Sequence, residues 1–342
     1  MKIIIKASII LLSILLTFSC NKSDGQYYEI KGYSQGGTYH IIYNEVDSSS
    51  KKISESPEQI HKLIEKKLQD CDFAFSGYNK ASLLTQINDN KTTKVNAIFE
   101  DIFNQSKEVY DETKGHFDPS AAPLFNVWGF GFSNEQNVSQ AMIDSIENFV
   151  GMDKAEIVNG HIIKNDSRFQ LNFNAIAQGY TCDYIGLALD SLGIKDYLVE
   201  VGMEILCKGK NASDKDWNIG VDAPIDSNMQ AGAELQNVID ITDCGIVTSG
   251  NYRKFRMIDG KKYAHTIDPT TGYPVRHNLL SATVVAKTSA LADAYATYCM
   301  VIGLEKSKTF LNSRTDLEGY LIYDKDGEFK TYFTKGLSTK IK

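Results

Sequence analysis

The stretch Asn172-Phe173-Asn174-Ala175-Ile176-Ala177-Gln178-Gly179-Tyr180 joins a predicted strand to a predicted helix. The strand covers 168–173, and the helix covers 178–192 and ends at Gly193. Backbone groups left free at such a junction can bind phosphate or a cation, although most strand-to-helix turns bind nothing. The junction therefore marks a candidate site whose meaning depends on the rest of the chain.

The order of strands and helices around this junction sets the fold class. Two strands are expected within 27–43, with a turn near Gly36-Gly37. Later strands arrive in runs rather than in alternation with helices, which favours an α+β fold over an α/β fold. These strands are predicted at 168–173, 197–201, 217–222, 237–241, 255–258, 262–266, 280–286, 318–323 and 328–333.

Three further helices are predicted from their end signals. Ser56-Pro57-Glu58-Gln59 is a capping box with proline at the first helical position, and Asn96 is expected to cap a second helix. A third covers 289–302 and ends at Gly303. Because the sequence has no internal repeat, low-complexity linker or clear domain break, we expect 27–342 to form a single integrated catalytic domain of mixed sheets with packed helices.

The first twenty residues have the pattern of a secretory signal. Two lysines give a basic start, and 9–16 is an apolar run too short for a comfortable transmembrane helix. The run closes before Cys20 in a way that resembles the lipobox of bacterial lipoproteins, with Thr17 in place of the usual leucine. We expect a lipoprotein signal peptide at 1–19 and a lipidated Cys20 with a tether at 20–26; the alternative is an ordinary cleaved signal. A lipidated chain would be exported, anchored to a membrane, and face the periplasm or the cell exterior.

The composition is that of a soluble globular protein without a nucleic-acid surface. Hydrophobic residues make up 42% of the chain and charged residues 23%. The net charge is -7, and no basic stripe is present to neutralise phosphates. The cysteines after Cys20 form no C-x-x-C pair, so one disulfide is possible but a disulfide scaffold or zinc ribbon is not expected. Rossmann and P-loop motifs are absent, so a nucleotide site must be of another kind.

Two more segments concentrate residues that a plain core does not require. The loop 115–124, continued by 127–131, holds prolines, glycines and a tryptophan, which is typical of a shaped binding loop or of a structural turn. In 265–274, preceded by 248–253, His265 ends a predicted strand beside an Asp-Pro turn. Such a histidine is either a general base or, more often, a hydrogen-bonded structural residue.

Asp293 and Thr297 lie four residues apart in the predicted helix 289–302, so both side chains are on one face. Their neighbours are apolar, and a carboxylate among apolar residues needs a partner. Carboxylate and hydroxyl oxygens, with carbonyl and phosphate oxygens added, suit Mg²⁺. The alternative is a first-turn aspartate that the helix dipole alone favours.

In this order and at these separations, the segments resemble the FAD:protein FMN transferase family, also called the ApbE family. The resemblance covers about Gly36 to Gly303. It implies an ApbE-like, T-fold-related domain that cleaves FAD with Mg²⁺, attaches FMN by a phosphoester bond to Thr or Ser of a target protein, and releases AMP. The matching motifs are F-S-x-Y at Phe75, F-D-P-S-A at Phe117, W-G-F-G at Trp128, N-A-I-A-Q-G-Y at Asn174, T-S-G-N-Y at Thr248, H-x-I-D-P-x-T-G-x-P at His265 and A-D-A-x-A-T at Ala292.

The resemblance also implies roles for single residues. Asp293, Thr297 and the backbone carbonyl of Ala175 match the Mg²⁺ ligands. His265 matches the base that takes the proton of the acceptor hydroxyl. The places that would contact FAD are Gly36, Tyr78, Asp118, Pro119, Ser120, Asn172, Gln178 and Ile267.

The chain departs from the family's pattern at three places. Gly36 stands where the usual M-G-T has methionine, Gln178 replaces a charged residue of many members, and Met203 interrupts the usual G-G-[DE]. None of these changes removes a metal ligand or His265.

Two other functions stay open beside flavin transfer. One is an FAD pyrophosphatase that gives free FMN and AMP, although the aromatic Tyr78 favours transfer. The other is a non-catalytic, lipid-anchored flavin-binding protein. For the transferase, the expected partners are FAD, extracytoplasmic proteins with a Thr or Ser flavinylation motif, and a membrane reached through the lipid.

Overall fold

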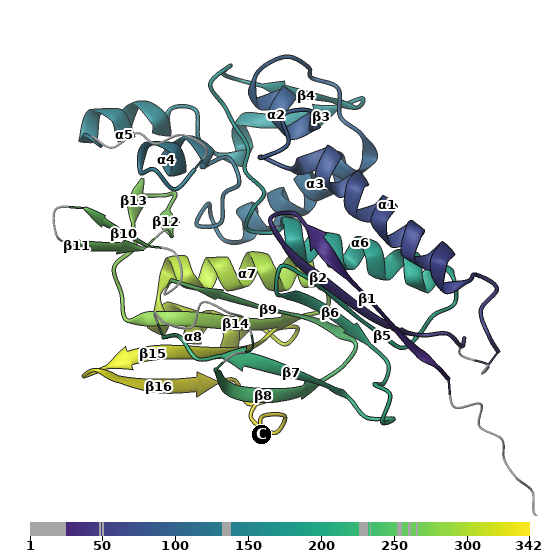
Figure 1. The fold of residues 1–342 in the computed structure, drawn as a ribbon. Coiled ribbons are helices and arrows are strands. Elements are labelled where there is room, and N and C mark those ends of the chain that lie inside the picture. Colours follow the sequence, from purple (N-terminus) through teal and green to yellow (C-terminus); the bar gives the residue numbers. More distant parts are fainter. Residues whose placement is uncertain are drawn as a thin grey trace, which may run out of the picture.

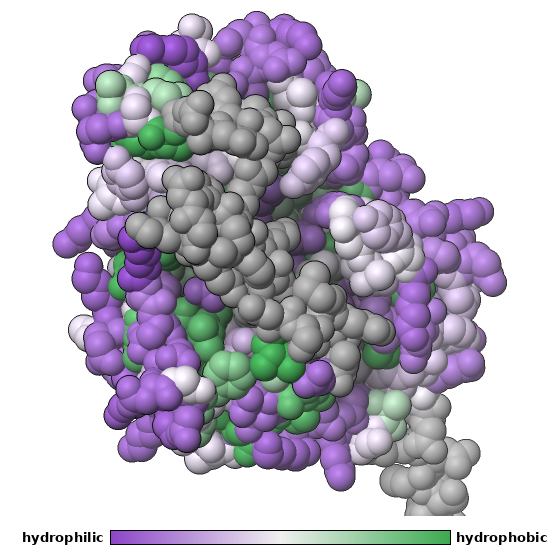
Figure 2. Space-filling view, turned by 60° about the vertical axis from the view of Figure 1, so that its left-hand side comes forward, coloured by the Kyte–Doolittle hydropathy of each residue, from purple (hydrophilic) through white to green (hydrophobic). Residues whose placement is uncertain are grey.

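The computed structural model describes residues 25–47, 49, 51–131, 138–225, 232, 234–251, 255–258, 261–264 and 266–342. The predicted signal peptide, Cys20 and His265 therefore lie outside the described residues. Within the described ranges, no helix is long and apolar enough to cross a membrane. Most of the surface seen in Figure 2 is hydrophilic, and apolar residues reach it in small patches.

An eight-stranded sheet forms the centre of the molecule (Figure 1). Each strand runs antiparallel to its neighbours. Because strands that arrive in runs pair in this way, the predicted α+β class is confirmed. The spatial order is β1 (Tyr27–Ser34), β2 (Gly37–Asn44), β5 (Tyr197–Val201), β6 (Glu204–Lys208), β9 (Cys244–Gly250), β14 (Leu279–Ala286), β15 (Glu318–Lys325) and β16 (Glu328–Phe333).

Helices cover one face of this sheet (Figure 1). α6 (Ala177–Ser191) lies against β5 and β6, and α7 (Ser289–Ile302) lies against β9 and β14. α1 (Pro57–Phe75) packs on α6, and α3 (Ala97–Glu112) contacts both α1 and α7. The hydrophobic core lies between these layers, in one cluster that joins α1 and α6 to β1, β2 and β5 and a second that includes α3, α7 and β14.

The opposite face of the sheet is covered by a two-stranded hairpin of β7 (Trp217–Asp222) and β8 (Leu235–Ile241). A third apolar cluster fills the space between this hairpin and the sheet. The inner strands of the sheet are thus covered on both faces, whereas the edge strand β16 is mostly exposed. The remaining elements are α2 (Leu83–Asn88), α4 (Ala122–Val127), α5 (Gln140–Glu147), α8 (Leu304–Ser313), the 3-10 turn η1 (Met152–Lys154), and the hairpins β3 (Ala155–Val158) with β4 (His161–Lys164), β10 (Phe255–Ile258) with β11 (Lys261–Ala264), and β12 (Ile267–Asp268) with β13 (Tyr273–Pro274).

The predicted helix caps are present. The Ser56 hydroxyl accepts the Gln59 N–H, and the Gln59 side chain accepts the Ser56 N–H at 2.7 Å, so α1 begins with the expected capping box. The Asn96 side chain accepts the Phe99 N–H at 2.9 Å and caps α3. Each cap satisfies backbone donors that no helical carbonyl can reach.

The predicted strand at 168–173 is wrong. This segment is extended, but it makes only an isolated parallel bridge, between Gln170 and Ala121. Its backbone donors are taken by other partners: the Leu171 N–H donates to the Asn88 side chain at 2.8 Å, and the Asn172 N–H donates to the Pro119 carbonyl at 2.7 Å. The alternation of polar and apolar residues predicts a strand here, but hydrogen bonds to a loop and to a side chain take the place of those of a strand ladder.

Candidate active site

The starts of α6 and α7 lie side by side, and each is held by a carboxylate of the other helix. Asp293 of α7 accepts the Gly179 N–H of α6 at 3.3 Å. In return, Asp183 of α6 accepts the Ser289 and Ala290 N–H groups of α7, both at 2.8 Å. Free N–H groups and the helix dipole make a helix start favourable for a negative charge. The two helices are therefore locked together, antiparallel, over their first turns.

Gly179 makes this close approach possible. A Cβ added at this position would lie 2.4 Å from the Ser289 carbonyl oxygen, which is shorter than any real contact of this kind. A larger residue would push α7 away from the start of α6 and take Asp293 with it. The close approach of α7 thus explains why glycine occupies this position of N-A-I-A-Q-G-Y.

Burial controls the charge of Asp293. Its side chain is only 4% exposed, and this burial raises the pKa to about 7, with a smaller contribution from the nearby charge of Asp183 and an opposing one from the Gly179 N–H. A carboxylate in this position is stabilised by any cation that binds beside it. The buried carboxylate therefore favours a cation as the ligand at the α6–α7 junction.

The residues around Asp293 supply oxygen donors that suit Mg²⁺. The Thr297 hydroxyl lies one turn further along α7 and 3.4 Å from the Ser249 hydroxyl of β9. Ala175 is partly buried just before α6 begins, on the same stretch as Gly179. The described residues contain no cluster of three or more His, Cys, Asp or Glu that could hold a metal. A cation here would therefore depend on carbonyl, hydroxyl and substrate oxygens beside one carboxylate.

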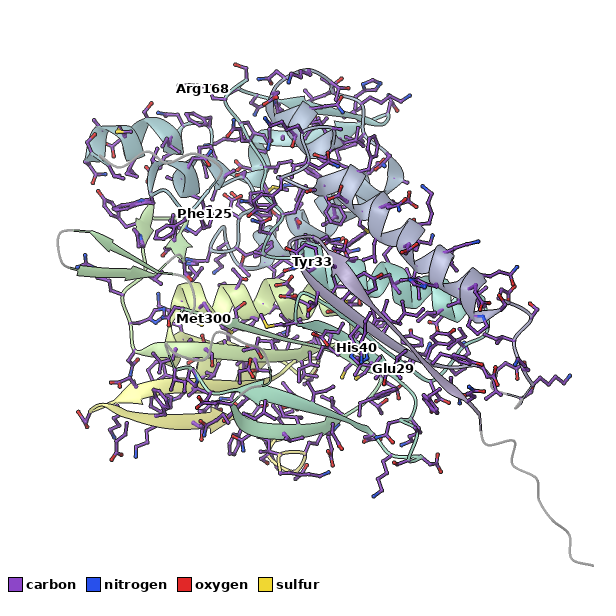
Figure 3. The ribbon with its side chains drawn as sticks, viewed as in Figure 1. Glu29, Tyr33, His40, Phe125, Arg168 and Met300 are labelled. Carbon is purple, nitrogen blue, oxygen red and sulfur yellow. The ribbon has the colours of Figure 1, made fainter. Side chains whose placement is uncertain are left out.

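Two hairpin tips and the Gln178 side chain meet at the edge of this junction. The β1–β2 turn places Gln35 and Gly36 at φ values of 53° and 78°, and the β5–β6 turn places Gly202 and Met203 at 67° and 88°. A Cβ on Gly202 would collide with the Gln178 amide nitrogen at 2.0 Å. The three places where the chain departs from the family's pattern thus lie together, with Tyr33 near the same hairpin tip (Figure 3).

The loop 118–123 packs against the stretch before α6 through the Pro119–Asn172 hydrogen bond described above. Asp118 and Ser120 are buried and partner each other, because the Asp118 carboxylate accepts the Ser120 hydroxyl at 2.6 Å. The Ser120 oxygen also accepts the Gly151 N–H at 2.6 Å. The side chains of Asp118 and Ser120 are therefore used in hydrogen bonds that stabilise the conformation of the loop.

The segment after His265 joins the same region. Ile267 is buried among apolar side chains of α4 and α5, so its side chain belongs to the core rather than to an open surface. The Trp128 indole donates to the Gly272 carbonyl at 2.8 Å, which ties the W-G-F-G turn to this segment. Tyr78 is 74% exposed at the end of α1, in a cavity of about 630 Å³ that Gly131 also lines.

Comparison with known proteins identifies the family of this chain. A model of the ApbE family matches residues 28–321. The chain belongs to the ApbE family.

Its relatives in the ApbE family match over most of their length. The FAD:protein FMN transferase of Haemophilus influenzae is 31% identical over 95% of this chain and 94% of its own length. The FAD:protein FMN transferase of Escherichia coli is 33% identical over 81% of this chain and 80% of its own. The structure of the flavin transferase ApbE from Vibrio cholerae superposes with a TM-score of 0.79, at 28% identity, over 92% of this chain and 99% of that one.

Two polar residues of this ApbE site were not found from the sequence. Asp183 holds the start of α7, and His116 lies with Nδ1 3.1 Å from the Asp268 carboxylate. Asp183 stands among apolar residues of a predicted helix, which is the signal that selected Asp293 and applies equally here. The pairing of His116 with Asp268 depends on the fold, and no local pattern predicts it.

Asp118 gives a prediction about pH. Burial raises its pKa to about 7, while the Ser120 hydrogen bonds act in the opposite direction. Because the unfolded chain releases this proton near pH 4 and the folded chain near 7, burial of Asp118 costs more stability as pH rises through that window. We expect the melting temperature of Asp118→Asn, which cannot ionise, to rise relative to that of the parent as the pH increases from about 4 to 7.

The measurement is a series of thermal melts of both proteins without FAD. Asp316 is the control, since its hydrogen bond with Arg314 lowers the pKa of the carboxyl. Asp316→Asn should lose stability relative to the parent above about pH 4, which is the opposite sign. Parallel curves for the parent and Asp118→Asn would contradict the prediction.

Proposed function

We propose that this chain is a Mg²⁺-dependent FAD:protein FMN transferase. The observation that carries the proposal is the family match along nearly the whole chain to proteins named for this activity. The buried Asp293 at the α6–α7 junction supports it, because a carboxylate with a raised pKa beside hydroxyl and carbonyl oxygens fits a cation that works on a pyrophosphate.

Asp293, Thr297 and the Ala175 carbonyl would hold the metal. When bound, Mg²⁺ offsets the negative charge of the FAD pyrophosphate and polarises the phosphoryl group. The acceptor Thr or Ser oxygen attacks the phosphorus of the FMN half, the bond to the AMP phosphate breaks, and AMP leaves. His265 takes the proton that the acceptor hydroxyl loses. The protein's main work is to position these groups and to stabilise charge.

The proposal is tested by incubation of the protein with FAD, Mg²⁺ and a candidate acceptor protein. Transfer gives a fluorescent acceptor band that survives denaturation, with one AMP released per FMN attached. Free FMN without a labelled band would instead identify the FAD pyrophosphatase. Bound FAD that is neither cleaved nor transferred would identify the non-catalytic flavin-binding protein.

We also propose that the protein acts outside the cytoplasm, held at a membrane by lipid on Cys20. The support is the amino-terminal pattern of basic start, short apolar run and cysteine. The acceptor proteins would then carry their Thr or Ser on the same side of the membrane, within reach of a short tether. The test is Cys20→Ser, which should release the protein from the membrane fraction. A variant that stays there would overturn the anchor.

A further inference from the structure

Cys207 and Cys244 face each other across the middle of the main sheet. They are direct partners in the antiparallel register of β6 and β9. Both are buried, at 0% and 8% exposure, in the apolar cluster beneath the β7–β8 hairpin. The Cys207 sulfur lies 3.6 Å from the Cys244 carbonyl oxygen. Hydrogen bonding with the Cys244 thiol is the largest cause of a raised pKa for Cys207, followed by burial.

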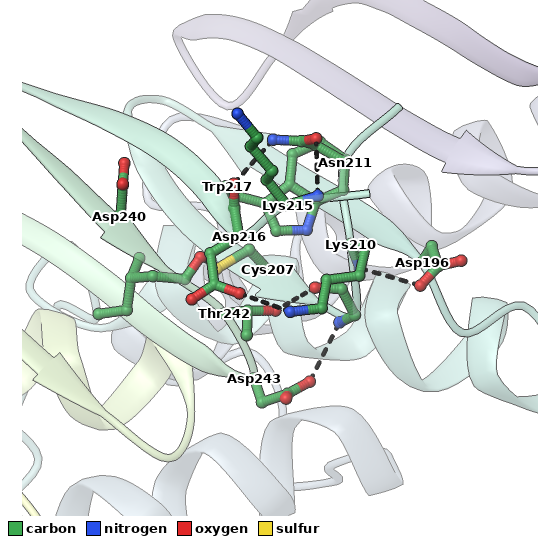
Figure 4. Close-up of polar contacts among 12 residues, drawn as sticks. Asp196, Cys207, Lys210, Asn211, Lys215, Asp216, Trp217, Asp240, Thr242 and Asp243 are labelled. Atoms are coloured by element: carbon green, nitrogen blue, oxygen red, sulfur yellow. Dashed lines mark hydrogen bonds and ion pairs between the residues drawn. The ribbon is translucent and has the colours of Figure 1, made fainter. Parts of the chain in front are cut away.

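Polar contacts next to this pair fix its register. Figure 4 shows the chain after Cys207 running beside Thr242 and Asp243, which precede Cys244. The Gly209 N–H donates to the Asp243 carboxylate at 3.0 Å, and the Thr242 hydroxyl donates to the Gly209 carbonyl. Slippage of β6 against β9 would break both bonds. The two thiols therefore stay opposite each other whenever the sheet is formed.

We propose that Cys207 and Cys244 form a disulfide in this protein. The inference rests on the export included in the proposed function, because disulfides persist in oxidising compartments. Residues directly opposite in an antiparallel pair have Cα atoms roughly 4.5–5.5 Å apart, within the range that a disulfide spans. The other three cysteines of the described chain, Cys71, Cys182 and Cys299, lie on three different helices.

The reaction needs an oxidant, which is a small disulfide such as oxidised glutathione. The thiolate of one cysteine attacks it and releases one reduced glutathione, and the second thiolate then attacks the mixed disulfide and releases another. Two electrons pass from the cysteines to glutathione, and the two thiol protons are released to solvent or to the leaving thiolates. Because burial keeps the thiols protonated and inaccessible in the folded protein, the bond forms during folding.

The bond would stabilise the part of the sheet that leads to the candidate active site. It closes a loop that contains the β7–β8 hairpin, and closing a loop restricts the unfolded chain. β9 continues from Cys244 to Ser249, whose hydroxyl lies beside Thr297. The disulfide thus anchors one end of a strand whose other end reaches the proposed metal ligands.

The test is refolding of the denatured, reduced protein in oxidised glutathione, followed by alkylation under denaturing conditions. We expect two fewer alkyl groups than in the reduced protein, a mass lower by two hydrogen atoms, and a Cys207–Cys244 cross-linked peptide. The melting temperature of the oxidised protein should be higher by several degrees. Cys207→Ser should lose all of these differences, whereas the matched control Cys299→Ser should keep them.

Equal alkylation of the refolded and reduced proteins, or a cross-link between another pair, would overturn the proposal. Alkylation of intact cells before lysis then shows whether Cys207 and Cys244 are paired in the compartment where the protein resides. Pairing in the refolded protein without pairing in cells would overturn the export on which the proposal depends, and with it the disulfide. Flavin transfer is measured separately on the same samples, so failure of the disulfide is distinguished from failure of the proposed activity.

Discussion

Asp293→Ala should abolish both AMP release and acceptor labelling. Asp293 is the carboxylate among the proposed metal ligands, and its burial leaves little room for water to replace it. Metal stabilisation of a phosphoryl group is worth several kcal/mol, and each 1.4 kcal/mol is a factor of ten, so we expect a loss of at least about 100-fold. The measurement is AMP release over a range of Mg²⁺ concentrations.

Asp293→Asn separates loss of the metal from loss of the fold. The amide keeps a carbonyl oxygen that can accept the Gly179 N–H, so the α6–α7 junction should remain intact and the melting temperature close to that of the parent. Its activity should nevertheless stay as low as that of the alanine variant, because the charge is gone. Asp144→Ala, at an exposed position of α5, is the control that should keep full activity. Folded Asp293→Asn with activity within tenfold of the parent would exclude Asp293 as a metal ligand.

The elements that are predicted best are those in which local patterns and global packing agree, whereas the central strands β6 and β9 were not predicted. The caps at Ser56 and Asn96, and the strands that become β14, β15 and β16, lie close to their predicted positions. These segments pair with sequence neighbours or bury one clear face, so a short window contains most of the information. The strand predicted at 168–173 fails because its hydrogen-bond partners come from the end of α2 and from a distant loop rather than from another strand.

In the candidate site too, the sequence predicts some features and misses others. The motif order predicts that Asp293, Thr297 and Ala175 belong to one site; in the structure the first two lie on α7 and the third just precedes α6, the helix that packs against α7. Asp183 carries the same signal as Asp293, a carboxylate among apolar residues of a predicted helix, but its partners at the start of α7 are set by packing. The internal pairing of Asp118 with Ser120 likewise depends on how the loop folds back on itself.

His265→Ala is expected to slow FMN transfer by about 10²–10⁴-fold, the usual contribution of a general base, with little change in FAD affinity. A histidine base works only when neutral, and its ordinary pKa is near 6.5. At a Mg²⁺ concentration high enough to keep Asp293 ionised, the rate of the parent should therefore fall as pH drops below that value, and the variant should lose this dependence. The measurements are single-turnover labelling from pH 5.5 to 8.5 and FAD binding by fluorescence.

His116 provides the sharpest comparison, because it is a second histidine and it pairs with Asp268, three residues after His265 in the sequence. Its pairing with Asp268 at 3.1 Å makes it either a rival base or a brace for the turn after β12. If His265 is the base, His116→Gln should retain the pH dependence of the parent and lose less rate than His265→Ala. His61→Ala, on the exposed surface of α1, should change neither quantity. If His116→Gln instead loses the fall in rate at low pH while His265→Ala keeps it, His116 rather than His265 is the base.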